Sequence, residues 1–303
     1  MNVIFMGTPD YAEKILQKLI DTEDINVKAV YTQPDKPVGR KKVMTAPVVK
    51  LLALEHGIPV YQPKKLRDES VVQELRKIAC DYIVVAAYGQ ILPKEILTYA
   101  PCINLHASIL PKYRGASPIQ QVLLNGESKT GVTAMLMDEG LDTGAILKVE
   151  TVTVSDDTMV EELFDTLTAV ATNLTVDVLK NYPTLTPIAQ DETAATHCKK
   201  ITKADGEVNF DDAIEVFNKY RAFTPWPGIY LSSGLKLKKI ALEEREKEFD
   251  NAGQIIAIEK ESIVVSCKRG AIRIFRVQPN SKKEMDITAY INGKRLLLED
   301  SFS

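Results

Sequence analysis

The residues best suited to chemistry lie in the segment Asn-Leu-His-Ala-Ser at positions 104–108. His106 follows the apolar run 103–105, so it stands at the end of a predicted strand, where α/β sheets hold their ligands. Residues two apart in a strand point to the same side, so Asn104 and His106 share one face. An amide NH2 group beside an imidazolium is a donor pair for a developing oxyanion. The pair predicts an acyl-type transfer centre; the alternative is an Asn104 that only satisfies backbone groups.

A carboxylate partner for His106 is expected in the loop Asp-Glu-Gly-Leu-Asp-Thr-Gly at 138–144, which follows another apolar run. A carboxylate there can keep the imidazole protonated, and it can accept a proton directly or through water. Asp142 is one candidate, and Asp138 and Glu139 are the others; the spacing does not choose among the three. The alternative is an aspartate that only forms the turn.

The other two histidines and the cysteines indicate no second centre. His56 ends a predicted helix before Gly57, where a cation suits the helix dipole. His197 lies in a polar connector, where we expect a solvated or capping side chain. The cysteines show no CxxC spacing, so we expect small core residues rather than a zinc site or disulfides, with a catalytic thiol as the alternative. They are Cys80, Cys102, Cys198 and Cys267.

Signals for phosphate binding are weak at the first strand and stronger beyond it. The turn 6–10 has a single glycine, which disfavours a dinucleotide-binding enzyme, and no P-loop motif follows. Segment 33–45 carries two prolines, a glycine and four basic residues. It predicts a long, mobile basic loop that is either solvated or in contact with phosphates and bases. Its basic residues are Lys36, Arg40, Lys41 and Lys42.

A second basic region runs from Lys268 to Arg295, with eight basic residues against two acidic ones. Arg273 and Arg276 are three apart, so they face opposite sides of one strand unless the strand twists or ends. The region suits a barrel face that touches an RNA backbone, and it suits a merely solvated set of strands equally well.

The elements that position these residues alternate in the first half of the chain. Predicted strands are 3–6, 27–32, 82–86, 103–105 and 132–137, and predicted helices are 10–19, 46–55 and 161–179. Thr45 is the expected N-cap of the second helix, with Pro47 in its first turn. Continuous apolar strands between helices predict an α/β fold, a Rossmann-like doubly wound and mostly parallel sheet.

The second half changes character after residue 181. Prolines, threonines and aspartates in 181–203 indicate a connector, and 212–222 has helical spacing. Short predicted strands at 229–231, 235–240, 253–258, 262–266 and 271–277 favour a small OB-like β-barrel. We therefore expect three parts: a catalytic domain at 1–182, a linker at 183–205 and a C-terminal domain at 206–303.

Composition limits the class of protein. Of 303 residues, 45% are hydrophobic and 26% charged, which suits a packed core, and the length favours two domains. No apolar run approaches the roughly 20 residues of a membrane span, and the start lacks the features of a signal peptide, so we expect a cytoplasmic protein. The net charge of −3 means that any RNA contact must come from local basic patches.

Together these motifs resemble a known family. Segments 104–111 and 113–115, with the loop 140–144, resemble the hallmark of the 10-formyltetrahydrofolate-dependent formyltransferases. Glycinamide ribonucleotide formyltransferases, formyltetrahydrofolate hydrolases and sugar formyltransferases share them. Segments 5–10, 32–37, 48–62, 86–93 and 221–228 are similar, in order and spacing, to methionyl-tRNA formyltransferases, so the resemblance covers nearly the whole chain.

The resemblance implies a role for each matching position. It implies that the catalytic residues are Asn104, His106 and Asp142. It implies that 10-formyltetrahydrofolate, the formyl donor, contacts Ser108, Ile109, Leu110, Pro111, Tyr88, Gly89, Ile91 and Leu92. It implies that tRNA contacts Lys36, Arg40, Lys41 and Lys42, with Arg40 at the key position. The family often has a second glycine after that arginine, and this chain lacks it, so its basic loop is shorter.

The implied activity is formyl transfer to the free α-amino group of initiator methionyl-tRNA, with no metal and with no membrane or obligate protein partner. Asn104 and a protonated His106 would donate to the oxyanion, and Asp142 would orient His106 and help move the proton off the amine. Two other classes compete. One is a sibling enzyme that formylates a small amine or hydrolyses formylfolate, which needs neither a basic loop nor an added barrel. The other is a non-catalytic RNA-binding protein, which does not need the three-residue set.

Overall fold

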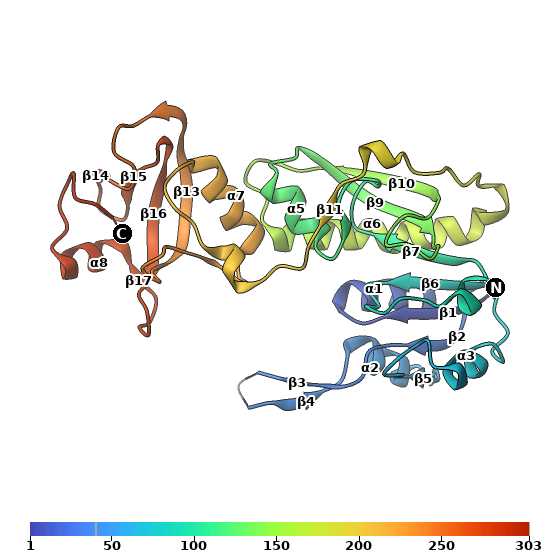
Figure 1. Ribbon diagram of the computed structural model, residues 1–303. Helices are drawn as coiled ribbons and strands as arrows, with labels where there is room; N and C mark the ends of the chain where they lie inside the picture. Colours follow the sequence, from blue (N-terminus) through green and yellow to red (C-terminus); the bar gives the residue numbers. More distant parts are fainter. Residues whose placement is uncertain (40, 303) are drawn as a thin grey trace. The chain divides into compact units, whose positions relative to one another are not determined.

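The computed structural model describes residues 1–39 and 41–302, and these form two compact units (Figure 1). The first unit comprises Met1–Pro118, Lys129–Val154 and Glu162–Cys198, and the second comprises Ile119–Ser128, Ser155–Glu161 and the chain from Lys199 onward. Each unit is therefore made of several separate stretches of the chain. The sequence instead predicts three consecutive parts, 1–182, 183–205 and 206–303. Those consecutive boundaries remain a prediction.

The first unit is built on a seven-stranded sheet in the order β10-β9-β7-β6-β1-β2-β5. Its strands are β1 (Asn2–Gly7), β2 (Asn26–Tyr31), β5 (Val60–Tyr61), β6 (Tyr82–Ala86), β7 (Cys102–His106), β9 (Lys129–Leu136) and β10 (Ile146–Thr153). The five strands from β5 to β7 pair in parallel, and β9 and β10 pair antiparallel. The chain reverses its winding between β1 and β6. The predicted mostly parallel, doubly wound α/β sheet is therefore confirmed.

The helices follow from the spacing of their apolar residues. α1 (Asp10–Ile20) buries Ile15, Leu16 and Leu19 on one face, as an amphipathic helix against a sheet must. The others are α2 (Val48–Glu55), α3 (Glu69–Leu75), α4 (Lys94–Leu97), α5 (Pro118–Leu124) and the 22-residue α6 (Val160–Asn181). No helix in the described part of the chain is long and apolar enough to cross a bilayer.

The basic segment after β2 departs from the prediction of a long loop. It forms an antiparallel hairpin of β3 (Lys36–Val38) and β4 (Val43–Thr45). Valines at its pairing positions favour strands, which explains the local order. Thr45 belongs to β4 and donates to the carbonyl of Val43 at 3.0 Å, so its predicted role as an N-cap is wrong. Pro47 takes the N-cap position of α2 without a side-chain cap.

The predicted connector is more ordered than its composition indicates. It contains short 3₁₀ turns at Tyr182–Thr184, Glu192–Ala194 and Lys203–Gly206, and the strand β11 (His197–Cys198). β11 pairs in parallel with β8 (Arg114–Gly115), which places His197 opposite Arg114. His197 is exposed, as predicted. The connector up to Cys198 thus groups with the first unit, and the linker bounds 183–205 remain a prediction.

The second unit holds an antiparallel sheet in the order β12-β13-β16-β15-β14, with β17 on β16. The strands are β12 (Ile229–Tyr230), β13 (Lys236–Glu248), β14 (Ile255–Ile258), β15 (Ile263–Ser266), β16 (Arg269–Gln278) and β17 (Met285–Asp286). α7 (Ala213–Phe223) is capped by Asp212, whose carboxylate accepts from the N–H groups of Ile214 and Glu215. α8 (Ile287–Lys294) was not predicted from the sequence, because its eight residues carry too few apolar positions to show a clear helical period. The predicted β-rich C-terminal class is confirmed.

Candidate active site

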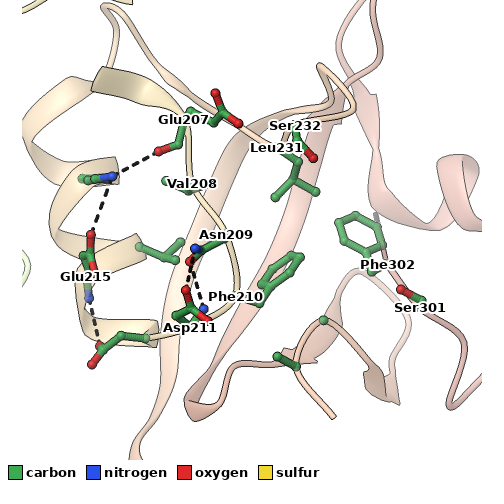
Figure 2. A pocket seen from close by; sticks show the side chains of 15 residues that line it. Glu207, Val208, Asn209, Phe210, Asp211, Glu215, Leu231, Ser232, Ser301 and Phe302 are labelled. Carbon is green, nitrogen blue, oxygen red and sulfur yellow. Dashed lines mark hydrogen bonds and ion pairs between the residues drawn. The ribbon is translucent and has the colours of Figure 1, made fainter. Parts of the chain in front are cut away.

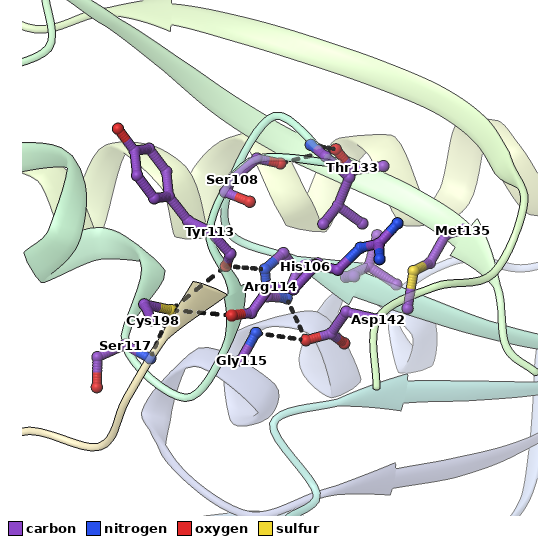
Figure 3. A network of polar contacts seen from close by, with 12 residues as sticks. His106, Ser108, Tyr113, Arg114, Gly115, Ser117, Thr133, Met135, Asp142 and Cys198 are labelled. Atoms are coloured by element: carbon purple, nitrogen blue, oxygen red, sulfur yellow. Dashed lines mark hydrogen bonds and ion pairs between the residues drawn. The ribbon is translucent and has the colours of Figure 1, made fainter. Parts of the chain in front are cut away.

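His106 ends β7 with a side chain that is 6% exposed (Figure 3). Its Nδ1 lies 3.6 Å from Oδ2 of Asp142, and its Nε2 lies 3.0 Å from the carbonyl oxygen of Tyr113. A carbonyl oxygen only accepts, so Nε2 carries a proton. Nδ1 faces a carboxylate, which also accepts. Both ring nitrogens of His106 therefore face hydrogen-bond acceptors.

Asn104 lies two residues earlier on the same strand and is half-buried. Its backbone neighbours are Val85 of β6 and Met135 of β9. Its side chain has no hydrogen-bond partner among the residues that the structure describes. The amide is therefore free to donate to a substrate oxygen on the face that it shares with His106.

The loop after β9 brings a single carboxylate to His106. Oδ2 of Asp142, near the imidazole, also accepts from the Gly115 N–H at 2.8 Å. Asp142 has φ +54°, a left-handed conformation that aspartate tolerates better than most residues. Its side chain is 12% exposed, so the pair is shielded from water.

The two competing carboxylates face elsewhere. Asp138 accepts from the Gly140 N–H at 2.9 Å and from Oγ1 of Thr143 at 2.6 Å, which is the behaviour of a turn former. Glu139 pairs with Lys94 at 3.4 Å on the surface. The geometry therefore separates three residues that the spacing in the sequence left equivalent.

Three further residues join this network, and none of their side chains was assigned a role from the sequence. Arg114 is only 2% exposed and donates to Gln190 and, through both terminal nitrogens, to Glu192. Hydrogen bonds from Arg114 hold the pKa of Glu192 below its usual range. Gln190 in turn donates to two carbonyls of the Asp142 loop. Arg114 was visible as part of a motif, whereas Gln190 and Glu192 sit in what reads as a polar connector.

The segment expected to contact folate is fixed to the sheet. Oγ of Ser108 donates to the carbonyl of Lys112 at 2.6 Å. Thr133 on β9 donates to the Ser108 carbonyl at 2.7 Å and accepts from the Leu110 N–H at 3.1 Å. Ser108 and Leu110 are buried, whereas Ile109 and Pro111 are half-buried. The latter two therefore present more of their surface to a ligand.

The residues after β6 that are expected to contact folate include both buried and exposed side chains. Tyr88 and Leu92 are buried in the apolar core with Leu66, and burial raises the pKa of Tyr88. Gly89 has φ +79°, which favours glycine. Ile91, by contrast, is 82% exposed. Only the outward part of this loop is available to a ligand in the structure.

The basic hairpin is anchored at its base and exposed along its length. Asp35 accepts from Gln62 at 2.7 Å and from Nζ of Lys50 at 2.9 Å, and these bonds hold its pKa below the usual range. The basic residues Lys36, Lys41 and Lys42 are exposed, as are the apolar residues Val38, Val43 and Met44. Arg40, the expected key arginine, lies outside the described residues.

The three arginines of β16 in the second basic region are paired with acidic neighbours. Arg269 pairs with Asp212. Arg273 pairs with Glu243 and Glu259, and Arg276 with Glu284 and Asp286. The register of β13 against β16 shifts at bulges between the residues paired with Arg273 and those paired with Arg276. The charge count of the sequence thus overstates the free positive charge on this strand.

A pocket of about 700 Å³ lies wholly within the second unit (Figure 2). The rings of Phe210 and Phe302 meet edge to face in it, with centroids 6.4 Å apart. Its acidic residues Asp211 and Asp212 are paired with Lys268 and Arg269. It contains none of the residues predicted for catalysis. Within residues 1–39 and 41–302, no group of three His, Cys, Asp or Glu side chains is arranged to hold a metal ion.

Comparison with known proteins identifies the family of this chain. Residues 1–179 match the formyl transferase family, and residues 200–295 match the formyl transferase C-terminal domain. A methionyl-tRNA formyltransferase of Sulfurimonas denitrificans is 63% identical over 303 residues, covering 100% of both chains. One from Nitratiruptor sp. is 54% identical over 304 residues, again covering 100% of both.

Solved structures share the fold at low identity. An N-formyltransferase of Helicobacter canadensis, in complex with folinic acid and dTDP-3-aminofucose, has a TM-score of 0.66 and 17% identity, covering 91% of this chain and 99% of that one. HypX of Aquifex aeolicus in complex with tetrahydrofolic acid has a TM-score of 0.60 and 16% identity, covering 99% of this chain and 48% of that one. On its sequence matches over both domains, the chain belongs to the formyl transferase family, alongside relatives named methionyl-tRNA formyltransferase.

Proposed function

We propose that this chain transfers the formyl group of 10-formyltetrahydrofolate to the free α-amino group of initiator methionyl-tRNA, giving N-formylmethionyl-tRNA for translation initiation. The pairing of His106 with Asp142 beside the unpaired amide of Asn104 carries the proposal. Full-length identity of 63% to a methionyl-tRNA formyltransferase supports the choice of substrate. We place the reaction in the cytoplasm, where initiator tRNA is used.

The chemistry begins with a neutral amine. An α-amino group has a reference pKa near 7.7–8.0, so a useful fraction is unprotonated at cellular pH. Its attack on the formyl carbon forms a C–N bond and places negative charge on the formyl oxygen. Asn104 donates to that oxygen through its free amide. When the bond to N10 of the folate breaks, the proton lost by the amine, carried by Asp142 or water, ends on N10.

His106 contributes positive charge beside the same oxygen. Its Nε2 proton is held by the Tyr113 carbonyl in the structure, so donation to the oxyanion requires that this bond be exchanged. Asp142 orients the ring from the opposite side. Removal of one donor of this kind typically costs ~10²–10³ in rate.

The residues proposed to hold the folate fit a flat, partly apolar ligand. Ile91 and Leu141 are apolar side chains that are 82% and 64% exposed, in the loops after β6 and β9. Such exposure of large apolar groups is common at ligand sites. Of the four residues 108–111, which follow His106 directly in the sequence, Ile109 and Pro111 are half-buried and Ser108 and Leu110 are buried, so the first two offer surface to such a ligand.

The basic hairpin is the proposed contact for the tRNA. Lys36, Lys41 and Lys42 are exposed, and Arg40 completes the set in the sequence. Backbone phosphates attract such residues regardless of sequence, so binding should weaken steeply with salt. The second unit is the proposed second contact.

One substrate-choice assay tests the proposal. The protein is given 10-formyltetrahydrofolate with charged initiator tRNA, free methionine, glycinamide ribonucleotide or no amine, and mass spectrometry identifies the products. We expect formylation of the methionyl-tRNA alone. Formylation of a small amine, or release of formate without an amine, would assign the chain to a sibling activity. No product with any acceptor would leave a non-catalytic RNA-binding role.

A further inference from the structure

A partly buried bridge of polar contacts joins the predicted connector to the loop that carries Asp142. We call residues 188–198 the strap; it is fixed at one end by the mutual backbone bonds of Ile188 and Ile146, both 2.8 Å, and at the other by β11. Between these ends, Gln190 points into the first unit. Nε2 of Gln190 donates to the carbonyl oxygens of Asp142 and Gly144, each at 2.8 Å. The strap therefore holds the backbone of the loop that carries the Asp142 carboxylate.

Arg114 fixes which way the Gln190 amide faces. Oε1 of Gln190 accepts from Nε of Arg114 at 3.1 Å and from Nη2 at 2.8 Å. A guanidinium has only donors, so it draws the amide oxygen towards itself and turns the NH2 group to the loop. On the other side of the guanidinium, Nη2 and Nη1 of Arg114 donate hydrogen bonds of 2.8 and 2.9 Å to the Glu192 carboxylate. The bridge is thus locked in one orientation.

Three consecutive residues connect this bridge to both members of the His106–Asp142 pair. The carbonyl of Tyr113 accepts from His106, and the N–H of Gly115 donates to the Asp142 carboxylate (Figure 3). Arg114, between them, acts on the Asp142 backbone through Gln190. The segment 113–115 therefore positions the imidazole of His106, the carboxylate of Asp142 and the loop that carries Asp142.

Within the loop, Asp138 accepts from Gly140 and Thr143, whereas Asp142 itself is held by Gln190, Gly115 and His106. Asp142 has φ +54°, a conformation that costs energy for a residue with a side chain, and its neighbour Leu141 is 64% exposed. Without Gln190, two carbonyls would lose their donor, and the loop would be free to relax. Relaxation would lengthen the 3.6 Å separation between Asp142 and His106.

We propose that Gln190 and Arg114 are positioning residues for formyl transfer, which hold Asp142 against His106 without touching substrate. The inference rests on the proposed function. It predicts that damage to the bridge lowers kcat and leaves KM for both substrates nearly unchanged, because neither residue contributes to binding.

The first test replaces Gln190 with glutamate or methionine. Q190E still accepts from Arg114 but has no donor for the two carbonyls, and Q190M removes the polar group without adding charge. A misplacement of ~1 Å can cost ~10²-fold, so we expect kcat to fall ~10–100-fold, with each KM within ~3-fold. The control is Gln73→Glu, the same change on the exposed face of α3. We expect its kcat to stay within ~2-fold of wild type.

The second test asks whether Gln190 acts through Asp142. Q190E is combined with Asp142→Asn, and single-turnover formylation is measured for all four proteins. We expect Q190E to change the rate less than ~3-fold once Asp142 is altered. An equal fold-loss in both backgrounds, or wild-type kcat for folded Q190E and Q190M, would overturn the inference. Thermal melting checks folding. A wild-type protein that fails to formylate methionyl-tRNA would instead refute the proposed function.

Discussion

Replacement of Asn104 with alanine tests the oxyanion site most directly. The structure separates its kinetic effect from its effect on folding. The backbone of β7 pairs with β6 and β9 whatever the side chain at position 104, and that side chain makes no hydrogen bond within the described chain. Truncation should therefore lower the free energy of unfolding by no more than about 1 kcal/mol. Loss of an oxyanion donor should raise the activation barrier by ~2.7–4 kcal/mol, which is ~10²–10³ in kcat.

The assay is single-turnover formylation of methionyl-tRNA, together with urea unfolding of the same protein. Asn181→Ala is the matched control, since Asn181 is an exposed asparagine at the end of α6 in the same unit. We expect the control to keep wild-type kcat. A folded Asn104→Ala protein with near-native kcat would refute the oxyanion role. A large rise in KM with kcat intact would show that Asn104 binds the ground state instead.

Three further predictions address the tRNA contact, the packing of the site and the response to acid. The double change Lys41→Ala, Lys42→Ala should raise KM for tRNA and reduce the slope of log affinity against log salt by up to ~2, with folate affinity unchanged; filter binding across salt concentrations measures this. Gly115→Ala should destabilise the first unit, because Gly115 has φ +116° and a Cβ there would lie 2.3 Å from a backbone carbonyl oxygen; a matching loss in urea midpoint tests it. Lys199 and neighbouring hydrogen bonds lower the pKa of Asp205 to about 2 from 3.8, so its stabilising effect is present above pH ~4 and lost between ~4 and ~2. Asp205→Asn should flatten the fall in stability over that window, and an unchanged acid profile would contradict the assignment.

The sequence was most informative where a pattern was continuous. The apolar run 82–86 coincides with β6, and the burial of both sheet faces explains why an uninterrupted run marks that strand. The face shared by Asn104 and His106 follows from the two-residue period of a strand. Spacing alone left Asp142, Asp138 and Glu139 open, and only the family resemblance pointed to Asp142, because loop dihedrals decide which carboxylate turns towards the imidazole.

The largest departures came from segments with polar composition. Residues 181–203 read as a linker because threonines, prolines and aspartates are typical of loops. Their role depends on long-range partners such as Arg114, 76 residues before Gln190 in sequence, and no local pattern reports such contacts. The basic segment after β2 read as a mobile loop because its charges and prolines masked the strand preference of Val38 and Val43.

The carboxylate partners of the β16 arginines also affect how the second unit meets a polyanion. A paired Arg and Glu nearly cancel beyond a Debye length of ~8–10 Å, so Arg269, Arg273 and Arg276 add little to any long-range attraction. Lysines without an acidic partner would therefore attract an approaching nucleic acid at long range. The guanidinium groups would interact with it only at contact, after their carboxylate partners had been displaced. Displacing the carboxylate costs free energy, and only a nucleic acid whose surface complements this unit would form enough new contacts to offset that cost. We therefore expect these three arginines to add little to non-specific binding of nucleic acid by this unit.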